Sequence, residues 1–378
     1  MLYKKLGNTE VEIPAIGQGT TGSGSYSNFN PEEVEKRIEV LTCGIDLGMT
    51  YLDTAELYGG GLAEEVVGEV IKGRRDKVFV ASKFNPKNNV FESVVDSIEG
   101  SLKRLRTDYI DLYQIHWPNP LIPILDTMEA LSTLVDQGKI RYIGVSNFSL
   151  EEFREAQSSL TIRTIVSNQV EYNLVYRSVE TDFLPFCEKE KVTLIAYSPL
   201  NQGRLLLTEK QKEVMSSLSA KYEKTIPQIV LRWLISHTPV VAIPQAKSLS
   251  HTKENALSTE FDLQDEDISK IDEVYIQQYV GVSPTRIRLN VSENRPIYMT
   301  IKEALDNRYD LIPSPLVLAK IISKRKYMKP IRLVPTKNAS SDYDYDIDDY
   351  DISDNVKKYW AWVIAYGDEA DMPAVIVA

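Results

Sequence analysis

Apolar and polar residues alternate along residues 11–246 in two different rhythms. Short apolar runs rich in Val, Ile and Tyr are separated by stretches, such as 34–45 and 91–105, whose apolar residues recur at helical spacing. The eight apolar runs lie at 11–19, 49–55, 77–84, 109–117, 140–148, 165–173, 193–200 and 240–246. Near-continuous apolar strands between amphipathic helices are typical of a parallel sheet covered by helices. Eight such units predict an α/β fold of the (β/α)8 type, a TIM barrel.

Two further segments flank the alternating region. The opening "YKKLGNTEVEIP" places Gly7 and Asn8 between two strand-like runs, which predicts a β-hairpin ahead of the first barrel strand. At the other end the alternation stops after an amphipathic helix at 263–275. We therefore expect two domains, a barrel over residues 1–275 and a small α/β domain over residues 276–378.

A doubly wound dinucleotide-binding fold is the alternative to the barrel. It requires a glycine-rich turn between its first strand and first helix, and "GQGTTGSG" offers Gly17, Gly19 and Gly22. These glycines do not lead into an apolar helix, because "SYSNFNPEE" follows them. The count of eight strands favours the barrel.

The expected C-terminal domain differs from the barrel in composition. It holds a basic run at 320–332, an acidic run at 342–354, a helix-like stretch at 356–367 and a strand-like stretch at 373–377. It has 14 basic and 14 acidic residues, so the formal net charge of −11 lies in residues 1–275. An acidic body repels phosphate backbones, which argues against nucleic acid as a partner.

Composition restricts the class of protein further. Hydrophobic residues make up 43% of the chain and charged residues 26%, as in ordinary globular proteins. No apolar run has membrane-spanning length, and the opening segment lacks the apolar core of a signal peptide. We expect a cytoplasmic protein without a membrane partner.

Cysteine and histidine usage predicts neither disulfides nor a metal site. The two cysteines, Cys43 and Cys187, lie far apart in sequence. The three histidines, His116, His237 and His251, have no ligand spacing with a cysteine or with one another.

Polar side chains end the predicted barrel strands, where the active sites of such barrels lie. Asp53 ends the second strand, with Tyr58 in the loop after it, Lys83 ends the third strand and His116 the fourth. Each residue alone is explained by capping, packing or solvation. Four of them on neighbouring strand ends predict one shared site.

The four residue types suit proton transfer to a carbonyl group. A phenol has a pKa near ~10, and a nearby ammonium lowers it by favouring the phenolate. Asp53 would keep Lys83 charged beside Tyr58, while His116 would hydrogen-bond and orient the carbonyl oxygen. Glu56, the other acid of the "LDTAELYG" stretch, receives no role and is expected to be solvated.

A series of motifs resembles the aldo/keto reductase family over roughly residues 1–275. The motifs, in order along the chain, are "LDTAELYG", "ASKF", "DLYQIHWP", "IRYIGVSNF", "NQVEYN", "AYSPL" and "IPQAKSLSHTKENA". The resemblance implies an NAD(P)H-dependent oxidoreductase that reduces aldehydes or ketones to alcohols by hydride transfer from nicotinamide C4. It also implies a catalytic tetrad of Asp53, Tyr58, Lys83 and His116, with Tyr58 as the general acid.

The resemblance further implies where the cofactor and the substrate bind. The substrate, a small carbonyl compound, would contact Tyr58, His116 and Trp117. NADP(H) is favoured on Lys247, Glu254 and Asn255. NAD(H) is the alternative, because the neutral Gln245 and His251 stand where relatives carry cations, which weakens the clamp on the 2′-phosphate. The implied cofactor-binding residues are Gly19, Thr20, Thr21, Asp53, Ser146, Asn147, Gln169, Tyr197, Ser198, Pro199, Leu200, Gly203, Ile243, Pro244, Ala246, Lys247, His251, Glu254 and Asn255.

Residues 276–378 look like the small α/β domain of ParB-type partition proteins and sulfiredoxin. The likeness lies in "PSPLVLAKIISKRKYMKPIRLVP" and "NVKKYWAWVIAYGDEADMPAVIV". The turn at 355–358 reads Asn-Val-Lys-Lys and lacks the Gly, acid and Cys of those families, so their nucleotide chemistry is not expected. A second hypothesis for the whole chain is a cofactor-binding sensor or regulatory subunit, with a protein partner bound through this domain.

Overall fold

The computed structural model describes residues 1–21, 33–119, 122–206 and 208–276, together with the backbone of five strands between residues 286 and 377. The chain divides into two compact units, Met1–Val280 and Gly281–Ala378. Each unit is described by itself below.

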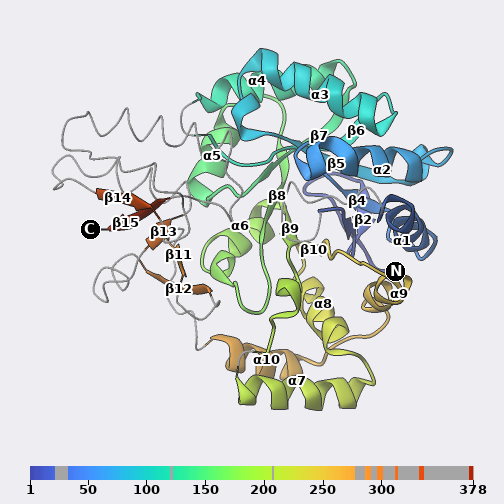
Figure 1. Ribbon diagram of the computed structural model, residues 1–378, viewed down its shortest axis with the longest axis vertical. Coiled ribbons are helices and arrows are strands. Elements are labelled where there is room, and N and C mark those ends of the chain that lie inside the picture. Colours follow the sequence, from blue (N-terminus) through green and yellow to red (C-terminus); the bar gives the residue numbers. More distant parts are fainter. Residues whose placement is uncertain are drawn as a thin grey trace. The chain divides into compact units, whose positions relative to one another are not determined.

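Eight parallel strands form the sheet of the first unit, and they follow one another in sequence order (Figure 1). They are β3 (Gln18–Gly19), β4 (Tyr51–Asp53), β5 (Phe79–Phe84), β6 (Ile110–Ile115), β7 (Ile140–Ser146), β8 (Ile165–Glu171), β9 (Thr193–Tyr197) and β10 (Val240–Ala242). The two edges meet, because Ile16 and Ala242 form a parallel bridge and the Gly17 N–H donates to the Ala242 carbonyl at 2.8 Å. The sheet thus closes on itself, which confirms the predicted barrel.

Helices follow the strands and surround the sheet (Figure 1). Three of them, α5, α7 and α8, begin with a capping box, in which Ser149, Thr208 and Thr225 satisfy free backbone N–H groups. The α-helices are α1 (Val34–Asp46), α2 (Leu62–Val70), α3 (Phe91–Leu105), α4 (Ile124–Asp136), α5 (Leu150–Ser158), α6 (Phe183–Glu190), α7 (Glu209–Tyr222), α8 (Ile226–Ser236), α9 (Leu249–Leu257) and α10 (Asp265–Ile276). Short 3-10 helices are η2 (Tyr58–Gly61), η3 (Arg75–Lys77), η4 (Pro86–Asn88), η5 (Ser178–Glu180) and η6 (Asn201–Gly203).

The predicted N-terminal hairpin closes the base of the barrel. Strands β1 (Tyr3–Lys5) and β2 (Glu12–Pro14) pair in antiparallel register. Leu6 and Ile13 of the hairpin are fully buried and share a core cluster with Tyr51, the first residue of β4. All strands of a parallel barrel begin at the same end. The hairpin therefore covers the amino-terminal ends of the strands, opposite to their carboxyl ends.

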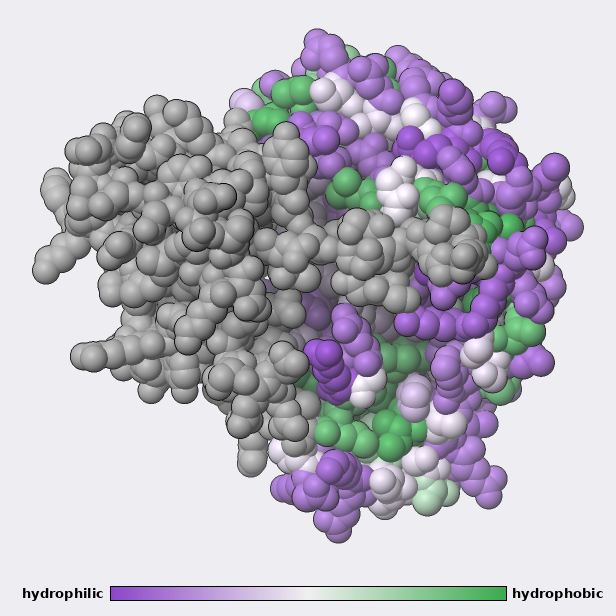
Figure 2. Space-filling model, viewed as in Figure 1, coloured by the Kyte–Doolittle hydropathy of each residue, from purple (hydrophilic) through white to green (hydrophobic). Residues whose placement is uncertain are grey.

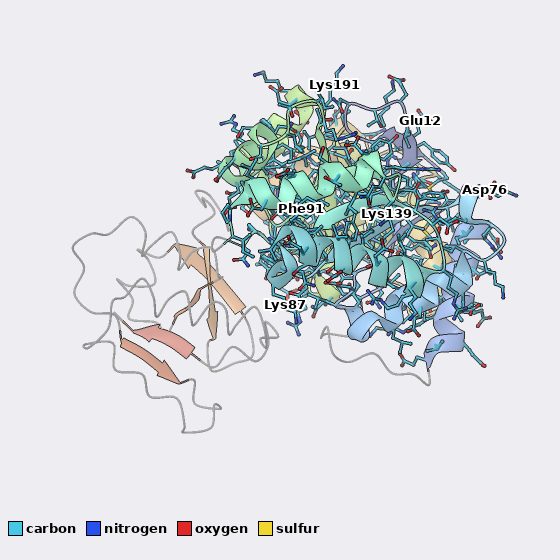
Figure 3. The ribbon with its side chains drawn as sticks, turned by 90° about the horizontal axis from the view of Figure 1, so that it is seen from above. Glu12, Asp76, Lys87, Phe91, Lys139 and Lys191 are labelled. Carbon is cyan, nitrogen blue, oxygen red and sulfur yellow. The ribbon has the colours of Figure 1, made fainter. Side chains whose placement is uncertain are left out.

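The surface of the first unit is mainly polar. Figure 2 shows hydrophilic side chains over most of the barrel face in view, with hydrophobic patches between them. Lys87, Asp76 and Lys191 are exposed, and Figure 3 shows them at the outer boundary of the unit. Among the described residues, no helix has both the length and the apolarity that crossing a membrane requires.

The second unit contains a five-stranded antiparallel sheet in the order β12-β11-β13-β15-β14. The strand-like stretch at 373–377 corresponds to β15. Several predicted features of this domain lie outside the described residues: the basic run up to residue 331, the acidic run, the turn at 355–358 and the helix-like stretch at 356–367. Most of the segments that resemble ParB-type and sulfiredoxin domains are among them. The strands are β11 (Arg286–Asn290), β12 (Pro296–Thr300), β13 (Leu311–Pro313), β14 (Arg332–Pro335) and β15 (Ala374–Val377).

Candidate active site

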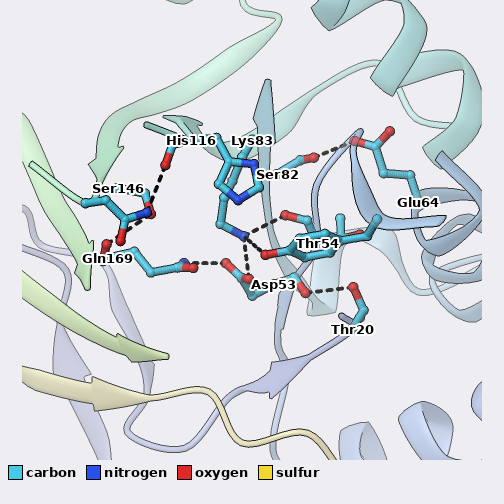
Figure 4. Close-up of polar contacts among 11 residues, drawn as sticks. Thr20, Asp53, Thr54, Glu64, Ser82, Lys83, His116, Ser146 and Gln169 are labelled. Atoms are coloured by element: carbon cyan, nitrogen blue, oxygen red, sulfur yellow. Dashed lines mark hydrogen bonds and ion pairs between the residues drawn. The ribbon is translucent and has the colours of Figure 1, made fainter. Parts of the chain in front are cut away.

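A buried lysine joins the polar ends of β4 and β5. The Lys83 Nζ lies 2.6 Å from the Asp53 Oδ1 and donates to the Thr54 carbonyl at 2.9 Å and to the Tyr58 hydroxyl at 3.2 Å (Figure 4). Lys83 is fully buried and Asp53 is 1% exposed. The ammonium therefore has an acceptor for each of its three protons, and one of them is the phenol oxygen.

His116 completes the group from the end of β6. Its ring centroid lies 5.7 Å from that of Tyr58, with the two planes at 77°. Both residues are buried, His116 at 3% exposure and Tyr58 at 5%. The structure thus brings Asp53, Tyr58, Lys83 and His116 together at the carboxyl ends of three adjacent strands.

Burial determines the protonation of Tyr58. It raises the pKa of the phenol well above its ordinary value, the charge of Asp53 raises it further, and a hydrogen bond with Thr21 lowers it. The sequence predicted a lowered pKa for this phenol, whereas the net shift is upward. The reason is that a phenolate here would lose its hydration, and this cost outweighs the favourable effect of the Lys83 ammonium beside it. Tyr58 is a protonated donor at neutral pH.

The other two titratable groups also respond to burial. Burial lowers the pKa of His116 well below its ordinary value, and the charge of Lys83 lowers it further. The imidazole is therefore neutral at pH 7. Burial lowers the pKa of Lys83, while the nearby charges of Asp53 and Glu64 raise it.

Amide and hydroxyl side chains continue the site across the ends of β7, β8 and β9. The Gln169 Nε2 donates to the Asp53 Oδ2 at 2.7 Å, and the Ser146 Oγ donates to the Gln169 carbonyl at 3.0 Å (Figure 4). The Asn147 Nδ2 donates to the Ser146 Oγ at 3.0 Å, and the Tyr197 hydroxyl donates to the Asn147 Oδ1 at 3.0 Å. Amide donors and acceptors beside the buried tetrad fit the carboxamide of a nicotinamide.

The ends of β3 and β10 lie side by side. The Thr20 Oγ1 donates to the Asp53 carbonyl at 2.9 Å, and the Gln245 Nε2 donates to the Thr21 carbonyl. A Cβ on Gly19 would stand 2.9 Å from the Ile243 carbonyl oxygen, so this close approach requires glycine. Gly19, Thr20 and Ala246 line a pocket between the strand ends and α1.

The remaining predicted cofactor positions lie in the loop after β9 and in the segment around α9. Ser198 has a left-handed backbone, with φ 47°, and its carbonyl accepts from the Asn173 Nδ2 at 3.0 Å. Pro199 and Leu200 lead into η6, which ends at Gly203. Trp117, the third predicted substrate residue, follows His116 and is partly buried. The predicted adenosine-end residues lie just before α9 or on it, namely Lys247, His251, Glu254 and Asn255.

Two carboxylates near Tyr58 were not predicted as part of this site. Glu56, expected to be solvated, has a side chain only 13% exposed, and that of Glu64 is fully buried. The Arg104 Nε donates to the Glu64 Oε2 at 2.7 Å. No pattern along the chain marked these residues, because Arg104 is 40 positions from Glu64 and only the folded barrel brings α3 beside it.

Comparisons with known proteins agree with this geometry. The Aldo/keto reductase family profile matches residues 15–276. Methylglyoxal reductase YeaE of Escherichia coli (strain K12) is 38% identical over 267 residues, which cover 70% of this chain and 92% of that protein. Glyoxal reductase of Bacillus subtilis (strain 168) is 35% identical over 73% of this chain and 94% of its own length.

Solved structures show the same relation. The thermostable aldo-keto reductase Tm1743, in complex with the inhibitor epalrestat, is 45% identical with a TM-score of 0.69, over 72% of this chain and all of that one. An aldo/keto reductase from Klebsiella pneumoniae in complex with NADP and acetate is 37% identical with a TM-score of 0.66, over 72% of this chain and 95% of that one. The sequence match, the barrel and the shared fold together show that this chain belongs to the aldo/keto reductase family.

Proposed function

We propose that this protein is an NADPH-dependent oxidoreductase that reduces aldehyde or ketone carbonyls to alcohols. The observation that carries the proposal is the buried contact of the Tyr58 hydroxyl with Lys83, which Asp53 holds in place at 2.6 Å. A protonated phenol in a buried site is a proton donor suited to a developing alkoxide. Membership of the family supports the same reaction.

In the proposed mechanism, Tyr58 is the general acid. The carbonyl oxygen receives the Tyr58 proton as the carbonyl carbon receives a hydride, which the reduced nicotinamide supplies when bound. Lys83 lies 3.2 Å from the phenol oxygen, so its ammonium stabilises the phenolate left behind. Neutral His116 donates a hydrogen bond that orients the carbonyl oxygen, and the phenolate then regains a proton from solvent.

The proposed cofactor is NADP(H). Ser146, Asn147 and Gln169 would hold the carboxamide, and Tyr197 would stack on the nicotinamide ring. The NADP and NADPH complexes of the Klebsiella pneumoniae relatives support this choice. In this chain Lys247 would contact the 2′-phosphate.

The other proposed cofactor contacts follow the strand ends. The pyrophosphate would lie along the loop that contains Ser198 and Gly203, and the adenosine would lie against the segment around α9. The further residues in this set are Gly19, Thr20, Thr21, Pro199, Leu200, Ile243, Pro244, Ala246, His251, Glu254 and Asn255.

Small 2-oxoaldehydes are the first substrates to test. The relatives named as methylglyoxal reductase and glyoxal reductase support this class. Trp117, which directly follows His116, would form the wall of the pocket. NADPH oxidation should be measured with methylglyoxal, glyoxal, simple aldehydes and ketones, with NADH in parallel. We expect turnover with NADPH and a lower kcat/KM with NADH, whereas no turnover with any carbonyl compound would contradict the proposal.

The separate second unit favours a further role in partner binding. It forms a compact unit of its own over Gly281–Ala378, which lies close to the proposed domain of residues 276–378. The likeness of this domain to ParB-type and sulfiredoxin domains stays a prediction. A cytoplasmic location also stays a prediction. Deletion of residues 277–378 tests this second role. We expect NADPH turnover to persist and a captured partner to be lost. Loss of turnover in a folded truncation would instead place the second unit in the reductase function.

A further inference from the structure

Along the chain Tyr58 is flanked by two carboxylates, Glu56 in the loop after β4 and Glu64 in the first turn of α2. Glu56 precedes it by two residues, and Glu64 follows it by six. Arg104 of α3 approaches both, with its Nε 2.7 Å from the Glu64 Oε2 and its Nη2 4.0 Å from the Glu56 Oε2. One guanidinium thus contacts both the carboxylate that precedes Tyr58 in sequence and the one that follows it.

Glu56 ties this segment to the strand that carries Lys83. Its Oε1 accepts from the Asn85 backbone N–H at 2.5 Å and from the Asn88 Nδ2 at 3.1 Å. Its own N–H donates to the Lys83 carbonyl at 3.1 Å. Three hydrogen bonds therefore fix Glu56 to the end of β5 and to η4, which follows that strand.

Glu64 and Arg104 fix the other side of the segment. The Ser82 Oγ donates to the Glu64 Oε1, and Ser82 directly precedes Lys83 in β5 (Figure 4). The Arg104 side chain packs against Gly61, where a Cβ would stand 2.5 Å from the Arg104 Cδ.

The turn after Tyr58 needs such support. Gly59, Gly60 and Gly61 all have positive φ, at 58°, 64° and 99°. Three successive glycines leave the unfolded chain with more freedom than other residues do, so the turn itself orders Tyr58 weakly. A displacement of about 1 Å at a reacting group lowers a rate by up to about 100-fold. The contact of 3.2 Å between the Tyr58 hydroxyl and the Lys83 Nζ therefore depends on anchors outside the turn.

We propose that Glu56, with Glu64 and Arg104, forms a positioning network that holds the Tyr58 hydroxyl against Lys83 for proton donation. The proposal rests on the reductase function above and assigns these residues to the same site. They are positioning residues, because they act through Tyr58 and Lys83 and not on the substrate.

The test separates the hydrogen bonds of Glu56 from its charge. Glu56→Gln removes the charge but keeps an acceptor oxygen for Asn85 and Asn88. We expect kcat within about threefold of wild type for Glu56→Gln, and a kcat about 10- to 100-fold lower for Glu56→Ala. The dissociation constant for NADPH, measured by fluorescence quenching, should stay within about twofold in both, because the network does not contact the proposed cofactor positions.

Two further variants keep the test decisive. Asn88→Ala removes one of the two donors to Glu56 and should lower kcat by about threefold to tenfold, so it decides the matter if Glu56→Ala does not fold. Arg141→Gln, in a charge cluster at the base of the barrel, is the matched control and should leave kcat unchanged.

Unchanged kcat in Glu56→Ala or Asn88→Ala would overturn the positioning role, as would a Glu56→Gln variant as slow as Glu56→Ala. These outcomes are distinct from failure of the reductase proposal, in which wild type itself shows no turnover or Tyr58→Phe turns over at the wild-type rate.

Discussion

The two ends of the barrel both bury an aspartate against cations, and they do so differently. At the mouth, Asp53 pairs with Lys83 at 2.6 Å. At the base, Asp111 of β6 pairs with Arg75 at 2.7 Å and with Arg141 at 2.9 Å. The two arginines lie over the ring of Tyr109, with their Cζ atoms 3.8 and 4.0 Å from its centroid.

The choice of cation separates the chemistry of the two ends. A guanidinium stays protonated in proteins and binds a carboxylate with a rigid fork, so the base cluster supplies geometry and no proton exchange. The ammonium of Lys83 has compact, rotatable donors, and one of them reaches a phenol oxygen. We infer that the base stabilises the fold, whereas the mouth is arranged for reaction. Each prediction below tests this difference.

The largest expected effect is on turnover at the mouth. Lys83→Met keeps the length of the side chain but removes the ammonium that would stabilise the Tyr58 phenolate. We expect kcat to fall by about 10³-fold, within the range for general acid–base catalysis. Steady-state NADPH oxidation measures it, and circular dichroism checks the fold. A variant with wild-type kcat would remove the distinction between the two ends.

The next effect is on stability at the base. Asp111→Asn keeps an acceptor for the Val80 N–H but leaves the mostly buried Arg75 guanidinium without its carboxylate. We expect a loss of about 3 kcal/mol in the free energy of unfolding, with kcat unchanged. Urea denaturation measures the first and NADPH oxidation the second. A tenfold loss of kcat at unchanged stability would show that the base takes part in the reaction.

A third difference concerns acid stability. The pKa of His116 lies well below its unfolded value of about 6.5, so below that pH the unfolded state binds a proton that the folded state refuses. Stability should therefore fall as the pH drops below about 6.5, by up to about 1.4 kcal/mol per pH unit from this residue. His116→Gln should flatten this slope, whereas Arg141→Gln should not. Equal slopes in wild type and His116→Gln would contradict the account.

The smallest effect is expected at the rim of the base. The Arg141 side chain is 55% exposed, and Asp111 keeps Arg75 when Arg141 is replaced. Arg141→Gln should lower the free energy of unfolding by less than about 1 kcal/mol. If urea denaturation shows that the free energy of unfolding falls by more than about 2 kcal/mol, Arg141 stabilises Asp111 as much as Arg75 does, which would contradict this expectation.

The barrel and the positions of the tetrad could be predicted from the sequence. Apolar runs mark the strands, and in a barrel their polar ends must meet at one mouth. Asp53, Lys83 and His116 were therefore predictable as neighbours. The apolar run at 11–19 predicted the first barrel strand, and the structure has that strand as β3, which contains only Gln18 and Gly19 and pairs with β4.

The surroundings of the tetrad could not be predicted in the same way. Glu56 follows a strand in a loop, where an acid is usually solvated, and tertiary contacts with Asn85, Asn88 and Arg104 withdraw it from water. The pKa of Tyr58 depends on how completely the folded site excludes water, which spacing along the chain does not reveal. Pairing across the sheet and dehydration are properties of the assembled barrel.

The most direct test of the central claim is a single turnover of wild type and Tyr58→Phe preloaded with NADPH and mixed with methylglyoxal. The two enzymes differ by one hydroxyl, and NADPH binding is measured in the same samples. We predict that hydride transfer in Tyr58→Phe is at least about 100-fold slower, with the dissociation constant for NADPH within about twofold of wild type. Equal rates of hydride transfer in the two enzymes would contradict the assignment of Tyr58 as the proton donor.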